Sequence, residues 1–121
     1  MLDKLKIVKD AGLKSIEICK TAGVKLGFGT DLLGNSFEHQ SREFEIRRQA
    51  QPIRDVIRSA TKLNAEILQQ EGELGVIKEG AIADLLLIEK NPFESPDVLQ
   101  GQGAHIPLIM KGGKIYKNNL I

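Results

Sequence analysis

The sequence is poor in residues that carry several common kinds of chemistry. Its 121 residues include one cysteine, two histidines, no tryptophan and only 4% aromatic residues. A single thiol forms no internal disulfide, and scarce aromatic rings provide few stacking surfaces for bases. The 17 basic and 16 acidic residues leave a net charge of +1, so no global field favours nucleic acid or an anionic membrane. We therefore expect no nucleic-acid partner and no disulfide scaffold.

Long apolar runs are also scarce. No run approaches the roughly 18 apolar residues of a membrane span, and none has the pattern of a signal peptide. The 41% hydrophobic content nevertheless suits a modest core for one domain. We expect a soluble protein in a reducing, cytoplasmic compartment, with no membrane partner.

One short stretch, residues 24–31, combines a strand pattern with an acidic end. Val24, Leu26 and Phe28 alternate with lysine or glycine, at the period of a strand, and the run ends in a Gly-Thr-Asp step. Side chains at the carboxyl ends of barrel strands line the catalytic cavity of α/β barrels, so Asp31 is a candidate catalytic residue. A simple turn, in which Asp31 bonds the local backbone, is the alternative.

Helical patterns precede and follow this stretch. Apolar residues three or four apart predict a helix over residues 3–22, closed by Gly23. The same spacing predicts a helix over residues 53–67, for which Pro52 suits the first turn. Between them, a serine can cap a short helix over residues 41–49.

The second part of the chain is rich in β-type residues. Short runs separated by glycine, proline and asparagine predict a small antiparallel β segment, with strands at residues 74–77, 84–88, 107–110 and 114–116. Gly112-Gly113 is a hairpin signal between the last two strands. Asp84 stands at the start of an apolar run, so we assign it a structural role.

Four segments, taken in order, resemble the metal-dependent amidohydrolases. They are residues 59–65 (Ser-Ala-Thr-Lys-Leu-Asn-Ala), 74–85 (Leu-Gly-Val-Ile-Lys-Glu-Gly-Ala-Ile-Ala-Asp-Leu), 91–92 (Asn-Pro) and 110–116 (Met-Lys-Gly-Gly-Lys-Ile-Tyr). The chain is most similar to the imidazolonepropionase-like and prolidase-like branch, in which an Ala-Thr-x-Asn-Ala helix precedes a Leu-Gly-x-Ile-x-x-Gly-x-x-Ala-Asp-Leu strand pair. Each segment alone is weak evidence for this family, and the four in this order are specific to it.

The resemblance implies an α/β fold and a place for this chain within it. The chain would supply the C-terminal fragment of a (β/α)8 metal-dependent hydrolase barrel, namely its last strand and helices, and the C-terminal strands of its small β-sandwich. Residues 1–68 would end the barrel, with Asp31 at the end of strand eight, and residues 69–121 would belong to the sandwich. The implied activity is hydrolysis of a C–N bond in a small amide or dipeptide, Xaa-Pro dipeptides included.

The resemblance also implies a cofactor and roles for particular residues. Family members use one or two divalent metals, usually zinc, to lower the pKa of a bound water. By the match, Asp31 would ligate metal and act as general base and then as general acid. The loop that follows shapes the substrate pocket in the same branch, so His39, Gln40 and Arg42 are candidates to bind substrate. A solvated loop histidine is the alternative for His39.

The other metal ligands of the family are not in this sequence. It contains no His-x-His and no Cys-x-x-Cys, and His105 has no acidic residue or histidine at ligand spacing. We therefore expect the chain alone to bind no metal and to be inactive, as the C-terminal portion of an amidohydrolase. The alternative is a free-standing, non-catalytic domain that oligomerises or binds a protein. Exposed apolar faces and strand edges lead us to expect a homo-oligomer.

Overall fold

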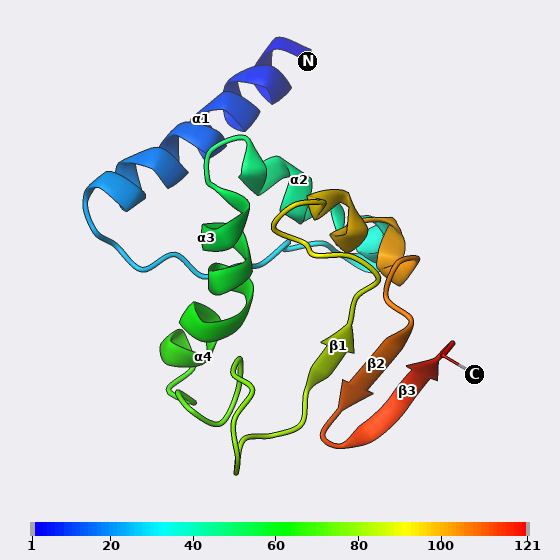
Figure 1. Ribbon diagram of the computed structural model, residues 1–121. Helices are drawn as coiled ribbons and strands as arrows, with labels where there is room; N and C mark the ends of the chain where they lie inside the picture. The colour runs from blue at the N-terminus through cyan, green and yellow to red at the C-terminus, as the bar shows by residue number, and fades with distance from the viewer. Residues whose placement is uncertain (1, 121) are drawn as a thin grey trace.

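The computed structural model describes residues 2–120, apart from the side chains of Leu2 and Leu5, as a group of helices beside a small sheet (Figure 1). The helical elements are α1 (Leu2–Thr21), η1 (Gly34–His39), α2 (Arg42–Arg48), α3 (Ile53–Arg58), η2 (Ser59–Leu63), α4 (Asn64–Ile67), η3 (Pro96–Leu99) and η4 (Gly101–Gly103). The strands are β1 (Leu85–Leu87), β2 (Leu108–Lys111) and β3 (Lys114–Asn118).

Helix α1 projects away from the rest of the molecule (Figure 1). Its extent confirms the helix predicted over residues 3–22, and it closes at Gly23, whose φ of +70° suits a residue without a Cβ. The apolar side chains of Ile7 and Val8 are 66% and 69% exposed. Lys20, near the end of the helix, is 3.1 Å from the carboxylate of Asp55 on α3. These apolar side chains of α1 are therefore not covered by the described part of the chain, whereas Ile16 and Cys19 further along the helix are half-buried.

A continuous helical segment made of α3, η2 and α4 forms the centre of the molecule, as the spacing over residues 53–67 predicts (Figure 1). Pro52 precedes it, and Val56, Ser59 and Ala65 are its buried residues. The middle turn, η2, is π-helical, which is a wider turn than that of an α-helix. The helical prediction is therefore confirmed in extent, with an irregularity that the spacing did not indicate.

Two predicted strands are not regular strands in the structure. Residues 24–28 are irregular, because no described strand lies beside them to complete a hydrogen-bonded ladder. Residues 74–77 are also irregular: Leu74 forms an isolated bridge with Glu71, and Gly75 has a φ of +69°. These two predictions were wrong because strand formation depends on a partner as well as on the local pattern.

The other three predicted strands are confirmed and form an antiparallel sheet in the order β1-β2-β3. Leu86 pairs with Ile109, and Ile109 with Lys117. The β2–β3 hairpin turns at two glycines with φ of +55° and +77°. Asp84 accepts a 2.7 Å hydrogen bond from the backbone N–H of Gly112 in this turn, which confirms its structural role.

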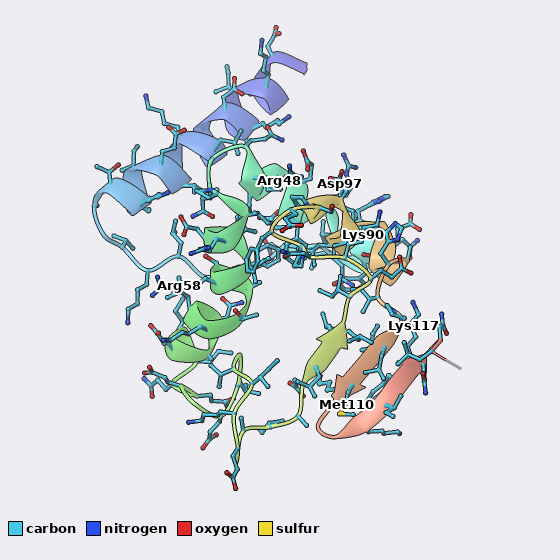
Figure 2. The ribbon with its side chains drawn as sticks, viewed as in Figure 1. Arg48, Arg58, Lys90, Asp97, Met110 and Lys117 are labelled. Carbon is cyan, nitrogen blue, oxygen red and sulfur yellow. The ribbon has the colours of Figure 1, made fainter. Side chains whose placement is uncertain are left out.

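A polar contact joins the two parts of the molecule at α2 and η3. Figure 2 shows Arg48 and Asp97 at this junction, and their charged groups lie 3.2 Å apart. Val98 and Leu99 of η3 are buried. The short helix η3 therefore links α2 to the segment that leads to β2.

An apolar groove of about 730 Å³ separates the central helix from the sheet. Its walls come from the helix, from residues 74–77 and from β1 and β2; they include Ile57, Ala60, Leu74, Val76, Leu85, Ile109 and Met110. The helix and the sheet therefore do not close on each other along these apolar faces. None of the helices within residues 2–120 has the length and the hydropathy needed to cross a membrane.

Gly75 is held where a side chain does not fit. A Cβ on Gly75 would lie 2.5 Å from the carbonyl oxygen of Thr61, and its φ is +69°. We expect Gly75→Ala to lower the free energy of unfolding by about 2 kcal/mol or more, from backbone strain and the clash together. Urea denaturation of the purified chain measures this change.

Gly12→Ala is the matched control, because nothing lies within 4 Å of the added methyl group. In the interior of α1 it should raise helix stability by about 0.5–1 kcal/mol. Equal stabilities of the Gly75→Ala variant and the parent would contradict the close approach.

Candidate active site

Side chains, rather than a neighbouring strand, bind the backbone of the segment that leads to Asp31. The backbone N–H of Phe28 donates to Oδ1 of Asn64 at 2.8 Å, and Nδ2 of Asn64 donates to the carbonyl oxygen of Phe28 at 2.9 Å. Asn64 is the first residue of α4, 36 positions further along the chain. One carboxamide therefore satisfies both backbone groups of one residue, as a paired strand would.

A second side chain binds the preceding residue. Nη2 of Arg47, on α2, donates to the carbonyl oxygen of Gly27 at 2.8 Å, and Nε donates to Glu43 at 3.0 Å. Arg47 is buried, and its guanidinium carbon lies 5.3 Å from the ring centroid of Phe28. That ring packs in turn on Phe44, at 4.7 Å between centroids. The charge of Arg47 is paired with Glu43, and Nε and Nη2 are hydrogen-bonded, whereas the buried Nη1 has no partner among the described residues.

Gly27 allows Asn64 to approach. A Cβ at Gly27 would lie 2.7 Å from Oδ1 of Asn64 and 3.1 Å from Cδ1 of Ile67. The glycine in the apolar–glycine alternation of this stretch therefore leaves room for a side chain from α4. We name Asn64, Arg47 and the backbone of residues 27–28 the backbone clamp.

Asp31 lies three residues after the backbone clamp and is exposed. Its φ of +49° is uncommon outside glycine, although aspartate tolerates this region better than most residues. Its carboxylate makes no hydrogen bond to the part of the chain that the structure describes, so the bond to the local backbone expected of a simple turn is not formed there. The carboxylate is therefore free to bind an external group.

The loop after Asp31 carries the three residues predicted to bind substrate. His39 ends η1, Gln40 follows it, and Arg42 begins α2; all three are exposed. Nε2 of His39 lies 3.5 Å from Glu38. Exposure alone does not test whether these residues bind substrate, so their binding role stays a prediction.

Gln102 holds this loop and was missed from the sequence. Its backbone N–H donates to Oγ of Ser41 at 3.2 Å, its Oε1 accepts from the Ser41 N–H at 3.2 Å, and its Nε2 donates to the carbonyl oxygen of Phe37 at 2.9 Å. The serine expected to cap α2 makes no side-chain capping bond and binds Gln102 instead. Glycines on both sides of Gln102, which itself has a φ of +52°, are the one local signal of this tight loop.

The described residues contain few metal-ligating groups close together. No three His, Cys, Asp or Glu side chains within residues 2–120 could jointly hold a metal ion. Nδ1 of His105 lies 3.0 Å from Glu89, an acidic neighbour that sequence spacing did not indicate, and both side chains are exposed. Asp31 can offer one oxygen ligand, which fits a share in a metal site completed by other residues.

Comparison with known proteins identifies the family. The model of the Amidohydrolase family matches residues 2–116. The chain belongs to the amidohydrolase family. The resemblance seen in its four sequence segments is therefore confirmed.

Solved structures match this chain over most of its length. The crystal structure of an amidohydrolase matches with 52% identity and a TM-score of 0.89, over 93% of this chain and 27% of that one. A prolidase complexed with N-methylphosphonate-L-proline matches with 44% identity and a TM-score of 0.85, over 88% and 26%.

The ochratoxinase of Aspergillus niger is 31% identical over 94% of this chain and 24% of its own length. The chain thus spans about a quarter of the length of these relatives.

A second tether joins the segment before Asp31 to α4. Nζ of Lys25 lies 2.9 Å from Oε2 of Glu66. The hydrogen bond from Lys25 holds the pKa of the Glu66 carboxyl below its ordinary value of 4.5; desolvation opposes this effect, and the charges of Lys25, Lys62 and Arg58 add to it. Because the folded-state pKa is lowered, this tether stabilises the fold above the unfolded pKa. Its contribution is lost as the pH falls through the lowered pKa.

We expect Lys25→Met to raise the pKa of Glu66, because the largest cause of its lowering is removed. Titration of the Glu66 side-chain carbon by NMR measures the shift. Lys4→Met removes the same charge from an exposed site on α1 and should leave the pKa of Glu66 unchanged. An equal response in both variants would mean that net charge, rather than the tether, sets the pKa.

Proposed function

We propose that this chain is the C-terminal part of a metal-dependent amidohydrolase that hydrolyses the C–N bond of a small amide or dipeptide. The observation that carries the proposal is the exposed carboxylate of Asp31, three residues beyond a segment fixed by the backbone clamp. Membership of the amidohydrolase family supports hydrolysis as the reaction, and the resemblance of the sequence segments implies the role of Asp31 in it.

In this proposal, residues 1–68 end a (β/α)8 barrel and residues 69–121 contribute strands to a small β-sandwich. Two features support the assignment. Residues 24–28 form no strand within the described chain, but they lie between α1 and the next helices, which is the place of a barrel strand in the order of elements. The apolar groove offers an uncovered surface on which further barrel and sandwich elements can pack.

Asp31 has two tasks in the proposed reaction. A divalent metal, zinc in many such enzymes, would supply an acidified water and polarise the amide carbonyl. Asp31 would provide one oxygen ligand and accept the proton that the water loses. It would then deliver this proton to the leaving nitrogen, so that the proton removed in the first step is returned in the second.

The substrate class follows from relatives and from the loop after Asp31. A prolidase with a bound proline phosphonate and a Xaa-Pro dipeptidase are among the similar structures. His39, Gln40 and Arg42 are the candidates to bind a substrate carboxylate or carbonyl, because they combine a cation with hydrogen-bond donors. We propose a small dipeptide-like substrate on these grounds.

The decisive test uses a fusion of this chain to the remaining, upstream part of the 52%-identical amidohydrolase. In this fusion, Asp31→Asn should fold normally and lose about 10²- to 10⁴-fold in turnover, because an amide cannot accept the proton. Hydrolysis of a panel of Xaa-Pro dipeptides and amides measures the loss. Turnover within a few fold of the parent fusion, with unchanged metal content, would reject the catalytic role.

Asp84→Asn is the matched control, since it makes the same chemical change in the hairpin turn rather than beside the site. It should shift the melting temperature and leave the chemical step unchanged. Elemental analysis of the same samples should find a divalent metal in the parent fusion. The isolated chain should bind zinc no more tightly than about millimolar, because one carboxylate is a poor site on its own.

A second candidate function is supported by a different observation, the exposed apolar surface. The apolar groove and the uncovered apolar side chains of α1 favour a non-catalytic domain that self-associates or binds a protein. We expect the isolated chain to form a homo-oligomer through these faces. Light scattering at tens of micromolar measures this, and a strict monomer would contradict it. An inactive parent fusion combined with a stable oligomer would favour this second function over the first.

A further inference from the structure

The backbone clamp fixes the position of the chain just before Asp31. Asn64 on α4 binds both backbone groups of Phe28, at 2.8 and 2.9 Å, and Arg47 on α2 binds the carbonyl oxygen of Gly27 at 2.8 Å. Two consecutive residues are thus tied to two different helices. Asp31 lies three residues further along, within about 10 Å of extended chain.

Within residues 2–120, no comparable hydrogen bond holds the backbone of residues 29–31. Gly29 is exposed, nothing lies within 4 Å of a Cβ built on it, and Asp31 has a φ of +49°. A left-handed residue outside glycine persists only where the surroundings fix it. The nearest fixed point on its N-terminal side is Phe28.

We propose that Asn64 is a positioning residue, which sets the orientation of Asp31 through the backbone of Phe28. Arg47 supports it through Gly27. The effect of Asn64 on the orientation of Asp31 concerns this chain alone. The effect on catalysis rests on the proposed function of Asp31.

Asparagine suits this role because its short side chain carries one acceptor and two donors. At neutral pH an aspartate at position 64 would keep the acceptor for the Phe28 N–H but would place an oxygen against the Phe28 carbonyl. Leaving such a group without its partner costs more than the bond contributes. Asn64→Asp is therefore a near-isosteric change that breaks half of the clamp.

The test is NMR of the isolated 121-residue chain. In Asn64→Asp, protection of the Phe28 amide from hydrogen exchange, relative to amides of α3, should fall about tenfold or more. The strong intraresidue NOE between the amide proton and Hα of Asp31, which marks a positive φ, should weaken. Gly27→Ala provides a second route, since it retains every donor and acceptor and displaces the Asn64 carboxamide by crowding alone.

Two controls separate positioning from a general loss of stability. Val56→Ala makes a cavity at a fully buried residue of α3 and should lower the melting temperature without changing the Asp31 NOE. Glu66→Gln removes the charge of the other tether between this segment and α4, which acts through the Lys25 side chain rather than the backbone. It should also leave the Asp31 NOE unchanged.

Loss of the Asp31 NOE in Asn64→Asp and Gly27→Ala, with its retention in both controls, supports the proposal. An unchanged NOE in both clamp variants overturns it, as does an equal loss in Val56→Ala. In the fusion, Asn64→Asp should lower kcat while KM and metal content stay within about twofold. Failure of the proposed function would appear separately, as full turnover of the Asp31→Asn fusion, and would leave the NMR result standing.

Discussion

The pairing of one asparagine side chain with the backbone of Phe28 is the constraint on which the arrangement of the helical part depends. Backbone polar groups need partners when they leave water, and residues 24–28 have no described strand beside them to provide these. Asn64 supplies both partners for one residue. Gly27 leaves the space that this contact needs, so the sequence of the segment and that of α4 are mutually dependent.

The same constraint explains how residues 27–28 are held in place in a molecule that leaves much apolar surface uncovered. Few apolar residues are buried in the described part of the chain, namely Val56, Ala65, Val98, Leu99 and Ile106. Much apolar surface remains in the apolar groove and on α1, and each 100 Å² of it would contribute about 2.5 kcal/mol if covered. Polar side-chain contacts, rather than an extensive core, therefore hold residues 27–28 to α2 and α4. The uncovered faces are consistent with a chain that spans about a quarter of its relatives' length.

The sequence predicted the elements whose pattern is local and missed the contacts that are not. Helical spacing located residues 53–67, and paired glycines located the β2–β3 hairpin. The strand prediction for residues 24–28 was wrong because an alternating pattern is not sufficient. A strand also needs a neighbouring strand with which to form hydrogen bonds. Arg47, Gln102 and Glu89 were missed for the related reason that their partners lie 20, 61 and 16 residues away. Asp31 could be singled out, since an acidic residue after an alternating run is a local signal.

The asparagine in the run Ala-Thr-Lys-Leu-Asn-Ala, residues 60–65, acquires a physical reason from these contacts. Its asparagine is unusual inside a helical segment, where it competes with the backbone for hydrogen bonds and lowers helix propensity. Here the carboxamide points away from its own helix and pairs with the main chain of Phe28. The helical cost is offset by the satisfied backbone groups of a segment that ends at Asp31. The presence of a residue with low helix propensity is thus explained by the hydrogen bonds that it makes to a different part of the chain.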